Sequence, residues 1–374
     1  MSEWKIVGII LIVILLFGTI RVFIELFGFP GFKSLYPTLE IDVDESKNKL
    51  AILIKKNGIY DTSKIKEELN AFLLSVKNDI GIDNVGVQRV ETNSLNETDQ
   101  FVEDLYYSKD VGYVIMIGRD LVCESIEEWR EETPNLFMLA DEKLSVIKRK
   151  KLEGPRIALS WIMAPFNYPD EDKREFVSNV IKTYTYYHNH PGEILAKFDR
   201  SYLMLVHPDN YENFYIDSPQ YSFPGTKVWT TNHSGVMKEM KKGHLVFCYV
   251  THGWEKGVEF GLDPDGSETT IEEYSKFIEE NGLPGLFVEP GSCFSNRPVI
   301  RKWWPLPPAE KLCCWPQANI GNGVWAYYYI GGGDLHCESI RKGFSEGPFI
   351  GYVVRRYHYD FCHGIYGDIT AHMI

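Results

Sequence analysis

The chain has 374 residues, of which 44% are hydrophobic and 24% charged, which is typical of a globular protein and argues against wholesale disorder. Its net charge of −13 argues against a general nucleic-acid-binding protein, because such proteins carry a basic surface, and we expect no nucleic-acid partner. Seven cysteines without a CxxC pair are too few for a disulfide scaffold in a chain of this length.

The N-terminus contains a long apolar segment. Residues 6–20 carry no charge, and the apolar pattern continues beyond Arg21. A bilayer core needs roughly 20 apolar residues, so residues 6–27 predict one transmembrane helix, and residues 30–49 predict a linker that leaves the membrane. A cleaved signal peptide is the alternative, but no small-residue cleavage site follows the apolar segment.

After the linker, apolar segments of strand length alternate with amphipathic segments of helical period. The strands are expected at 50–54, 85–90 and 113–118, and the helices at 61–80 and 98–107. Such an alternation predicts a parallel sheet with helices on both faces. We therefore expect a smaller N-terminal α/β subdomain over residues 50–150.

The same alternation starts again and predicts a second unit over residues 155–374. Its strands are expected at 156–160, 202–206, 245–250, 286–288 and 324–330, with helices at 176–184 and 271–280. The fold class is therefore α/β, with a mostly parallel sheet flanked by helices.

Two strands of the second unit end in residues that can perform chemistry. The strand 245–250 continues into His252 and Gly253, and the strand 286–288 continues through a turn of small residues into Cys293. Sites in parallel sheets form beyond the carboxyl ends of neighbouring strands, so His252 and Cys293 would emerge together if these strands are adjacent. An imidazole can take the proton of a thiol, and the thiolate is a nucleophile. The backbone N–H groups of Gly253 and Cys293 would then form an oxyanion hole.

Each of these residues also has a structural interpretation. A histidine at a strand end is commonly a polar cap, and a buried cysteine commonly packs as a small apolar residue, as we expect for Cys248 in the middle of its strand. A zinc site is another alternative, although adjacent Cys-Cys and His-Cys pairs are poor ligand spacings; it would use Cys313, Cys314, His336, Cys337, Cys362 and His363.

At the histidine and cysteine strands the chain resembles the clan CD cysteine peptidases, which are the caspase-like group, and within that group the gingipain-like family. The residues that carry the resemblance are YVTHG at 249–253 and LFVEPGSC at 286–293. Further similar segments are YVIMIGRD at 113–120, GVWAYYYIGGGD at 323–334 and YGD at 366–368. The resemblance covers most of the chain after residue 50. The proline that usually follows the terminal Gly-Asp is Ile369 in this chain.

The resemblance implies a caspase–hemoglobinase fold, with His252 as the base, Cys293 as the nucleophile, a protein or peptide substrate and no cofactor. Members of the family cleave after basic residues, which would require an acidic pocket; the candidates are Asp209, Glu289 and Asp334, and the sequence does not rank them. Members also bind structural calcium. The acidic segment 261–268 lacks the ligand spacing of an EF-hand loop, so we expect no metal.

Together these features predict a membrane-anchored cysteine endopeptidase. The alternative is a catalytically inactive caspase-like domain that serves as a binding or scaffold module on the same anchor. Glycosylation sequons begin at Asn96 and Asn232 and matter only outside the cell. Because the resembling family is mainly secreted, we expect a single-pass membrane protein with an extracytoplasmic catalytic domain.

Overall fold

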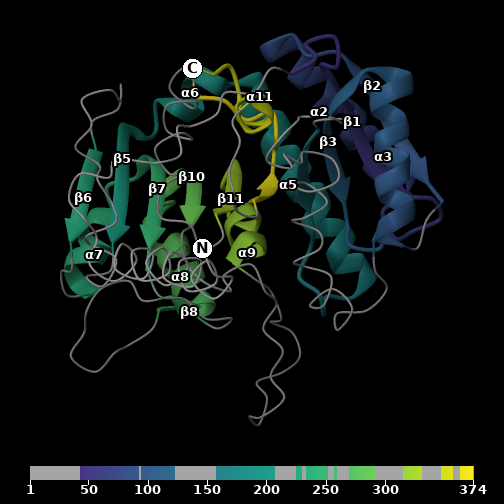
Figure 1. The fold of residues 1–374 in the computed structure, drawn as a ribbon. Helices are drawn as coiled ribbons and strands as arrows, with labels where there is room; N and C mark the ends of the chain where they lie inside the picture. The colour runs from purple at the N-terminus through teal and green to yellow at the C-terminus, as the bar shows by residue number, and fades with distance from the viewer. Residues whose placement is uncertain are drawn as a thin grey trace, which may run out of the picture.

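The fold is centred on one large sheet. The computed structural model describes residues 43–91, 94–122, 157–206, 225–229, 233–251, 257–258, 269–290, 315–330, 347–356 and 363–373. In these residues ten strands form one sheet with the order β2-β1-β3-β4-β12-β11-β10-β7-β5-β6 (Figure 1). A short second sheet pairs β8 (Gly257–Val258) antiparallel with β9 (Thr269–Thr270).

The N-terminal half of the sheet contains four parallel strands. These are β1 (Lys49–Lys55), β2 (Asn84–Val90), β3 (Val111–Ile117) and β4 (Ala158–Ile162). All seven residues of β3 and the five central residues of β1 are buried, as expected for strands that are covered on both faces. The strands predicted in this half are confirmed.

The helices of this half begin and end where the sequence places their capping residues. Helix α2 (Ser63–Ile80) starts after Thr62, whose hydroxyl accepts a hydrogen bond from the N–H of Ile65, and it ends at Gly81 in the left-handed conformation. Its apolar face packs against α5 (Asp170–Asn189), and α3 (Leu95–Lys109) packs against β3. The predicted helices are therefore confirmed; α3 is longer than predicted, and α2 begins two residues later than predicted.

The C-terminal half contains five parallel strands. These are β5 (Asp199–Val206), β6 (Gly225–Trp229), β7 (His244–Val250), β10 (Gly285–Pro290) and β11 (Ala326–Ile330). The last strand, β12 (His363–Gly367), pairs antiparallel with β11 and contacts β4 through Ile365 and Tyr366. This strand joins the two halves, so one mostly parallel sheet runs through both predicted units.

Several short helices complete this half: α6 (Pro191–Leu195), α7 (His233–Met240), α8 (Ile271–Asn281), α9 (Trp315–Gly321) and α11 (Ile350–Arg356). Helix α8, which the sequence predicts, begins with a capping box between Thr270 and Glu273. It forms the connection between β7 and β10.

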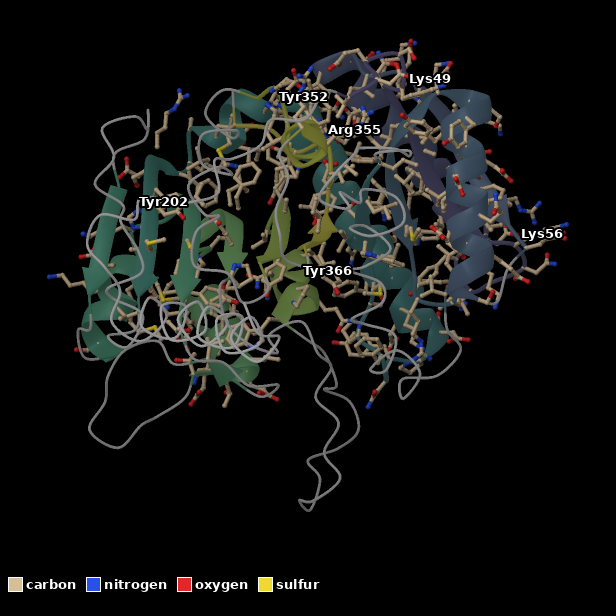
Figure 2. The ribbon with its side chains drawn as sticks, in the orientation of Figure 1. Lys49, Lys56, Tyr202, Tyr352, Arg355 and Tyr366 are labelled. Carbon is tan, nitrogen blue, oxygen red and sulfur yellow. The ribbon has the colours of Figure 1, made fainter. Side chains whose placement is uncertain are left out.

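Helix α11 lies where β1 and β3 begin. The Nη1 atom of Arg355 donates to the carbonyl oxygen of Lys47 at 2.7 Å, and its guanidinium lies 5.0 Å from the ring centroid of Tyr113. Figure 2 shows Tyr352 and Arg355 near Lys49 at the start of β1, whereas Lys56, just past its end, lies well away from them. The C-terminal segment reaches the same helix, because the N–H groups of Ile350 and Gly351 donate to residues 371 and 369.

The predicted transmembrane segment 6–27 and most of the linker 30–49 lie outside the described residues. Within the part of the chain that the structure describes, no helix combines the length and the apolar character needed to cross a bilayer. The boundary predicted between the two units, at residues 150–155, also lies outside the described residues.

Candidate active site

The strands β7 and β10 are direct neighbours and run parallel. Their paired residues extend from His244 with Gly285 to Tyr249 with Pro290. The pairs have a constant offset of 41 residues, since 285 − 244 and 290 − 249 give the same difference. The expectation that these two strands lie side by side is therefore confirmed, and both end at the same edge of the sheet.

The predicted catalytic residues follow directly after these strand ends. Thr251 directly follows β7, is buried and is the last described residue before His252, and Pro290 is the last residue of β10. His252, Gly253 and Cys293 lie outside the described residues. His252 and Cys293 are themselves separated by 41 residues (293 − 252), which equals the offset of the strand pairs below them.

A packed aromatic group supports this edge from one face of the sheet. The ring of Trp315, the first residue of α9, lies 4.9 Å from the ring of Tyr274 in α8 and 6.3 Å from that of Tyr249 near the end of β7. The Tyr274 hydroxyl donates to Asn319 Oδ1 at 2.9 Å, and all three rings are fully buried. The end of β7 is therefore closely packed against α8 and α9.

One of the three acidic candidates for a specificity pocket is described, and it is buried. Glu289 is fully buried in β10, and its Oε2 atom accepts a hydrogen bond from the hydroxyl of Tyr202 in β5 at 3.1 Å (Figure 2 labels Tyr202). A buried carboxylate needs such a partner, because losing water otherwise costs several kcal/mol. Asp209 and Asp334 lie outside the described residues.

The other cysteine predictions have mixed outcomes. Cys248 is fully buried in the middle of β7, so its predicted role as a core residue is confirmed. Of the alternative zinc cluster, only His363 is described, as the first residue of β12. That zinc site therefore stays an untested alternative.

A small cavity of about 150 Å³ opens where β1, β3 and β4 end, and no sequence pattern predicted it. Tyr60, Asp120, Phe166 and Lys173 are among its lining residues. Burial raises the pKa of the Asp120 carboxyl, against the attraction of nearby cations. The cavity wall at Ala164 contacts α9 through a hydrogen bond, in which Gln317 Nε2 donates to the Ala164 carbonyl oxygen at 2.8 Å.

Side chains able to hold a metal ion converge elsewhere in the described part of the chain. Asp79, His188 and His372 lie at the edge where β11 begins, opposite to the edge where β7 and β10 end. Burial opposes charge on His188, but Asp368 and Asp79 raise its pKa to about 9. No pattern in the sequence marked these residues, because they come from distant segments.

Comparison with known proteins finds similarity only at the level of the fold. No family model matches the sequence, and no curated protein matches it. Among solved structures, the Arg-specific cysteine proteinase gingipain R (RgpB) superposes with a TM-score of 0.56 at 14% identity, covering 88% of this chain and 79% of that chain.

Two further solved structures give the same result. The complex of the Porphyromonas gingivalis RgpB pro- and mature domains has a TM-score of 0.53 at 12% identity, covering 86% of this chain and 79% of that chain. A structure described as a protease has a TM-score of 0.52 at 12% identity, covering 88% and 79%. The chain therefore has the fold of gingipain-type, caspase-like cysteine proteinases, which confirms the expected resemblance at that level.

Proposed function

We propose that the chain is a membrane-anchored cysteine endopeptidase in which His252 is the general base and Cys293 the nucleophile. The observation that carries this proposal is the pairing of β7 with β10 at the same 41-residue offset that separates the two side chains. The gingipain-like fold supports the same reaction class.

The register supports a close approach of the two groups. His252 lies three residues beyond Tyr249, and Cys293 lies three residues beyond Pro290, which is the partner of Tyr249. Neighbouring strands are about 4.8 Å apart, so residues at equal heights on them start within side-chain reach of one another. A nucleophile and its base need to come within about 3 Å, which side-chain rotation at these two positions would provide.

The proposed reaction follows from the chemistry of the two groups. His252 takes the proton of the Cys293 thiol, and the sulfur attacks the peptide carbonyl carbon. The N–H groups of Gly253 and Cys293 stabilise the oxyanion, and the imidazolium then protonates the leaving amine as the C–N bond breaks. Water, deprotonated by His252, hydrolyses the thioester and releases the acid and the free thiol.

The substrate is a protein or peptide, and one structural fact bears on its side chain. RgpB is described as Arg-specific, and a preference for a basic side chain would require a carboxylate exposed at the cleft. Glu289 is buried and engaged by Tyr202, which favours a structural role for it. Asp209 and Asp334 are thus the better candidates for such a pocket. No cofactor is needed for this chemistry.

The anchor completes the proposal. The apolar segment 6–27 would hold the catalytic domain at a membrane, with the domain on the extracytoplasmic side. Two measurements in sealed vesicles test this placement. One is whether added protease can cleave the chain near Asn232, and the other is whether Asn232 is glycosylated.

Covalent labelling tests the catalytic proposal. We expect a peptidyl acyloxymethyl ketone to label the full chain in detergent at one site, and Cys293→Ala to abolish labelling and peptide hydrolysis. The matched control is Cys248→Ala, which removes a buried thiol and leaves labelling intact. Labelling that survives in Cys293→Ala contradicts the proposal. Absence of both labelling and hydrolysis across a diverse peptide library in the folded wild type would favour the inactive binding domain.

A further inference from the structure

Three side chains from distant parts of the chain, two buried and one partly buried, meet at one point. Asp79 belongs to the last turn of α2, His188 to the last turn of α5, and His372 to the C-terminal segment. Asp79 Oδ2 lies 2.6 Å from His188 Nδ1 and 2.7 Å from His372 Nε2. The three donor atoms all lie within 4.8 Å of one another, and the exposed fractions of the side chains are 9%, 0% and 3%.

The second ring nitrogen of His188 is held by another carboxylate. His188 Nε2 lies 2.6 Å from Asp368 Oδ2, which also accepts from Trp325 Nε1 at 2.9 Å. The other oxygen of Asp368 accepts from the backbone N–H of Thr370 at 2.8 Å. A histidine that binds a metal ion almost always donates its other ring N–H to a carboxylate or carbonyl group, which fixes the tautomer and orients the ring. His188 already has this arrangement.

The balance of protons and charges favours a cation at this point. A neutral imidazole carries one N–H, and the Nε2–H of His188 is directed at Asp368, so its Nδ1 lone pair would face the carboxylate of Asp79. A proton or a metal ion must lie between those two acceptors. Once metal binding holds both imidazoles neutral, the two carboxylates give the cluster a charge of −2, which needs compensation in a buried site. One divalent ion compensates it fully.

We propose that Asp79, His188 and His372 bind one divalent transition-metal ion, with Zn²⁺ as the best fit. Imidazole nitrogen and carboxylate oxygen are both zinc ligands, and the second oxygen of Asp79 or a water molecule would complete four-fold coordination. The ligand atoms of a tetrahedral zinc lie about 3.3 Å apart, as follows from bond lengths of about 2.0–2.1 Å. The distances from Asp79 Oδ2 to the two histidine nitrogens, 2.6 and 2.7 Å, therefore need to lengthen by less than about 1 Å to admit the ion.

The role of this site is structural and does not depend on the proposed peptidase activity. The ion would connect α2, α5 and the C-terminal segment at one point. It would add to the contacts of Glu68 in α2 with Ser178 and Lys182 in α5, and to the hydrogen bonds of Asp368. The site lies at the edge where β11 begins, whereas His252 and Cys293 follow strands that end at the opposite edge. Loss of the ion should therefore lower stability and leave the proposed catalytic chemistry in place.

Metal titration tests the site. We expect the full chain without an affinity tag, stripped of metal in detergent, to bind one equivalent of Co²⁺ with the visible absorption of tetrahedral coordination, and Zn²⁺ to displace it and raise Tm. His372→Asn and Asp79→Asn should each weaken binding by more than about 100-fold, since even outer-sphere changes cost about 10–100-fold. The matched control is His190→Asn, which removes an exposed histidine two residues from His188 and should leave binding unchanged.

A measurement on the wild type keeps the proposal testable if a variant fails to fold. X-ray absorption of the Zn²⁺-loaded chain should show nitrogen and oxygen ligands with the signature of two imidazoles. Sulfur ligands would overturn the proposal and point to the cysteine-rich residues 313–314 and 336–337 instead. Failure of the folded wild type to bind an equivalent of Co²⁺ or Zn²⁺ would also overturn it, and would leave a protonated hydrogen-bond network at this position.

Discussion

The two edges of the C-terminal half of the sheet differ in how their polar residues are brought together. At the edge where β7 and β10 end, the candidate catalytic residues each follow directly after a strand and come from two segments joined by one crossover helix. At the edge where β11 begins, the polar residues come from α2, α5, the start of β11 and the C-terminal segment. The first arrangement depends on strand order alone, whereas the second depends on the packing of the whole domain.

The largest expected effect concerns the edge where β7 and β10 end, which we call the first edge. His252→Ala should lower kcat/KM by about 10³-fold, within the range typical for the loss of a general base. It should also shift the pH dependence of Cys293 alkylation towards that of an ordinary thiol, with a pKa of about 8.5, because no imidazole would then stabilise the thiolate. The alkylation rate is measured with iodoacetamide between pH 5 and 10. An unchanged alkylation profile would show that the two side chains are not coupled. It would contradict the catalytic pair proposed for the edge where β7 and β10 end.

The second prediction tests the other edge. Asp368→Asn removes a fully buried carboxylate that contacts His188 and Trp325, and leaves the buried imidazole without one of its two charge partners. In the metal-free protein, where the raised pKa keeps His188 protonated, we expect the free energy of unfolding to fall by about 3–5 kcal/mol, the usual cost of breaking a buried ion pair. Urea denaturation measures this change, and kcat/KM per folded molecule should stay the same.

A matched control for that variant is Glu193→Gln. It breaks an exposed ion pair with Lys197 and should change stability little, as surface pairs do. If Asp368→Asn lowered activity in the folded fraction as strongly as a change at the first edge, the two edges would be energetically coupled rather than independent.

Periodicity was sufficient to predict most of the fold. The strands at β1, β3, β7 and β10 are continuous apolar segments, and α2 has both a clear apolar face and capping residues, so local sequence and tertiary structure agree. The strands β6 and β12 were not predicted. β6 contains a glycine and a lysine in five residues, and β12 contains two glycines and a histidine, so neither has an apolar segment. Each forms because a neighbouring strand supplies its hydrogen-bond partners.

At the candidate active site, the adjacency of the strands was predictable for the same reason, whereas the catalytic residues themselves lie outside the described residues. Strand adjacency followed from the apolar segments and the helix between them, and the structure confirms it. The burial of Glu289 beneath Tyr202 was not predictable, because it depends on which face of β10 meets β5 across β7. Nor was the cluster around His188, since its members are up to 293 positions apart in the chain. Long-range polar contacts leave no periodic trace in a single sequence.

A third prediction extends the comparison to an ion pair nearer the surface. Burial acts to raise the pKa of Asp61, but bonds from Arg89, the Asn57 N–H and Lys66 outweigh it and lower this pKa to about 2. The folded-state pKa lies below the unfolded value of about 3.9, so the stabilisation is present above pH 4 and is lost as pH falls towards 2.

Urea denaturation across this pH range measures the effect. Asp61→Asn should lose about 1–2 kcal/mol of stability at pH 7, after allowance for partial screening of its exposed cationic partners, and should match the wild type near pH 2. Glu91→Gln is the control, since Glu91 pairs with Lys56 in an exposed position. A difference in the free energy of unfolding between Asp61→Asn and wild type that persists at pH 2 would contradict this prediction. It would mean that the packing of Asp61, and not its charge, stabilises the protein.

The smallest expected effect lies in the helix that connects the two edges. The Thr270 hydroxyl accepts from the N–H of Glu273 at 3.2 Å, and the Glu273 carboxylate accepts from the N–H of Thr270 at 2.8 Å, so both backbone groups at the start of α8 are satisfied. Thr270→Ala should cost about 1 kcal/mol in urea denaturation, whereas Thr270→Ser keeps the cap and should cost less. Because the rings of Tyr274 and Trp315 fix α8 against the strand ends, kcat/KM should not change. A loss of activity larger than the loss of folded protein would show that the cap positions the turn after β7, and that the first edge depends on more than strand order.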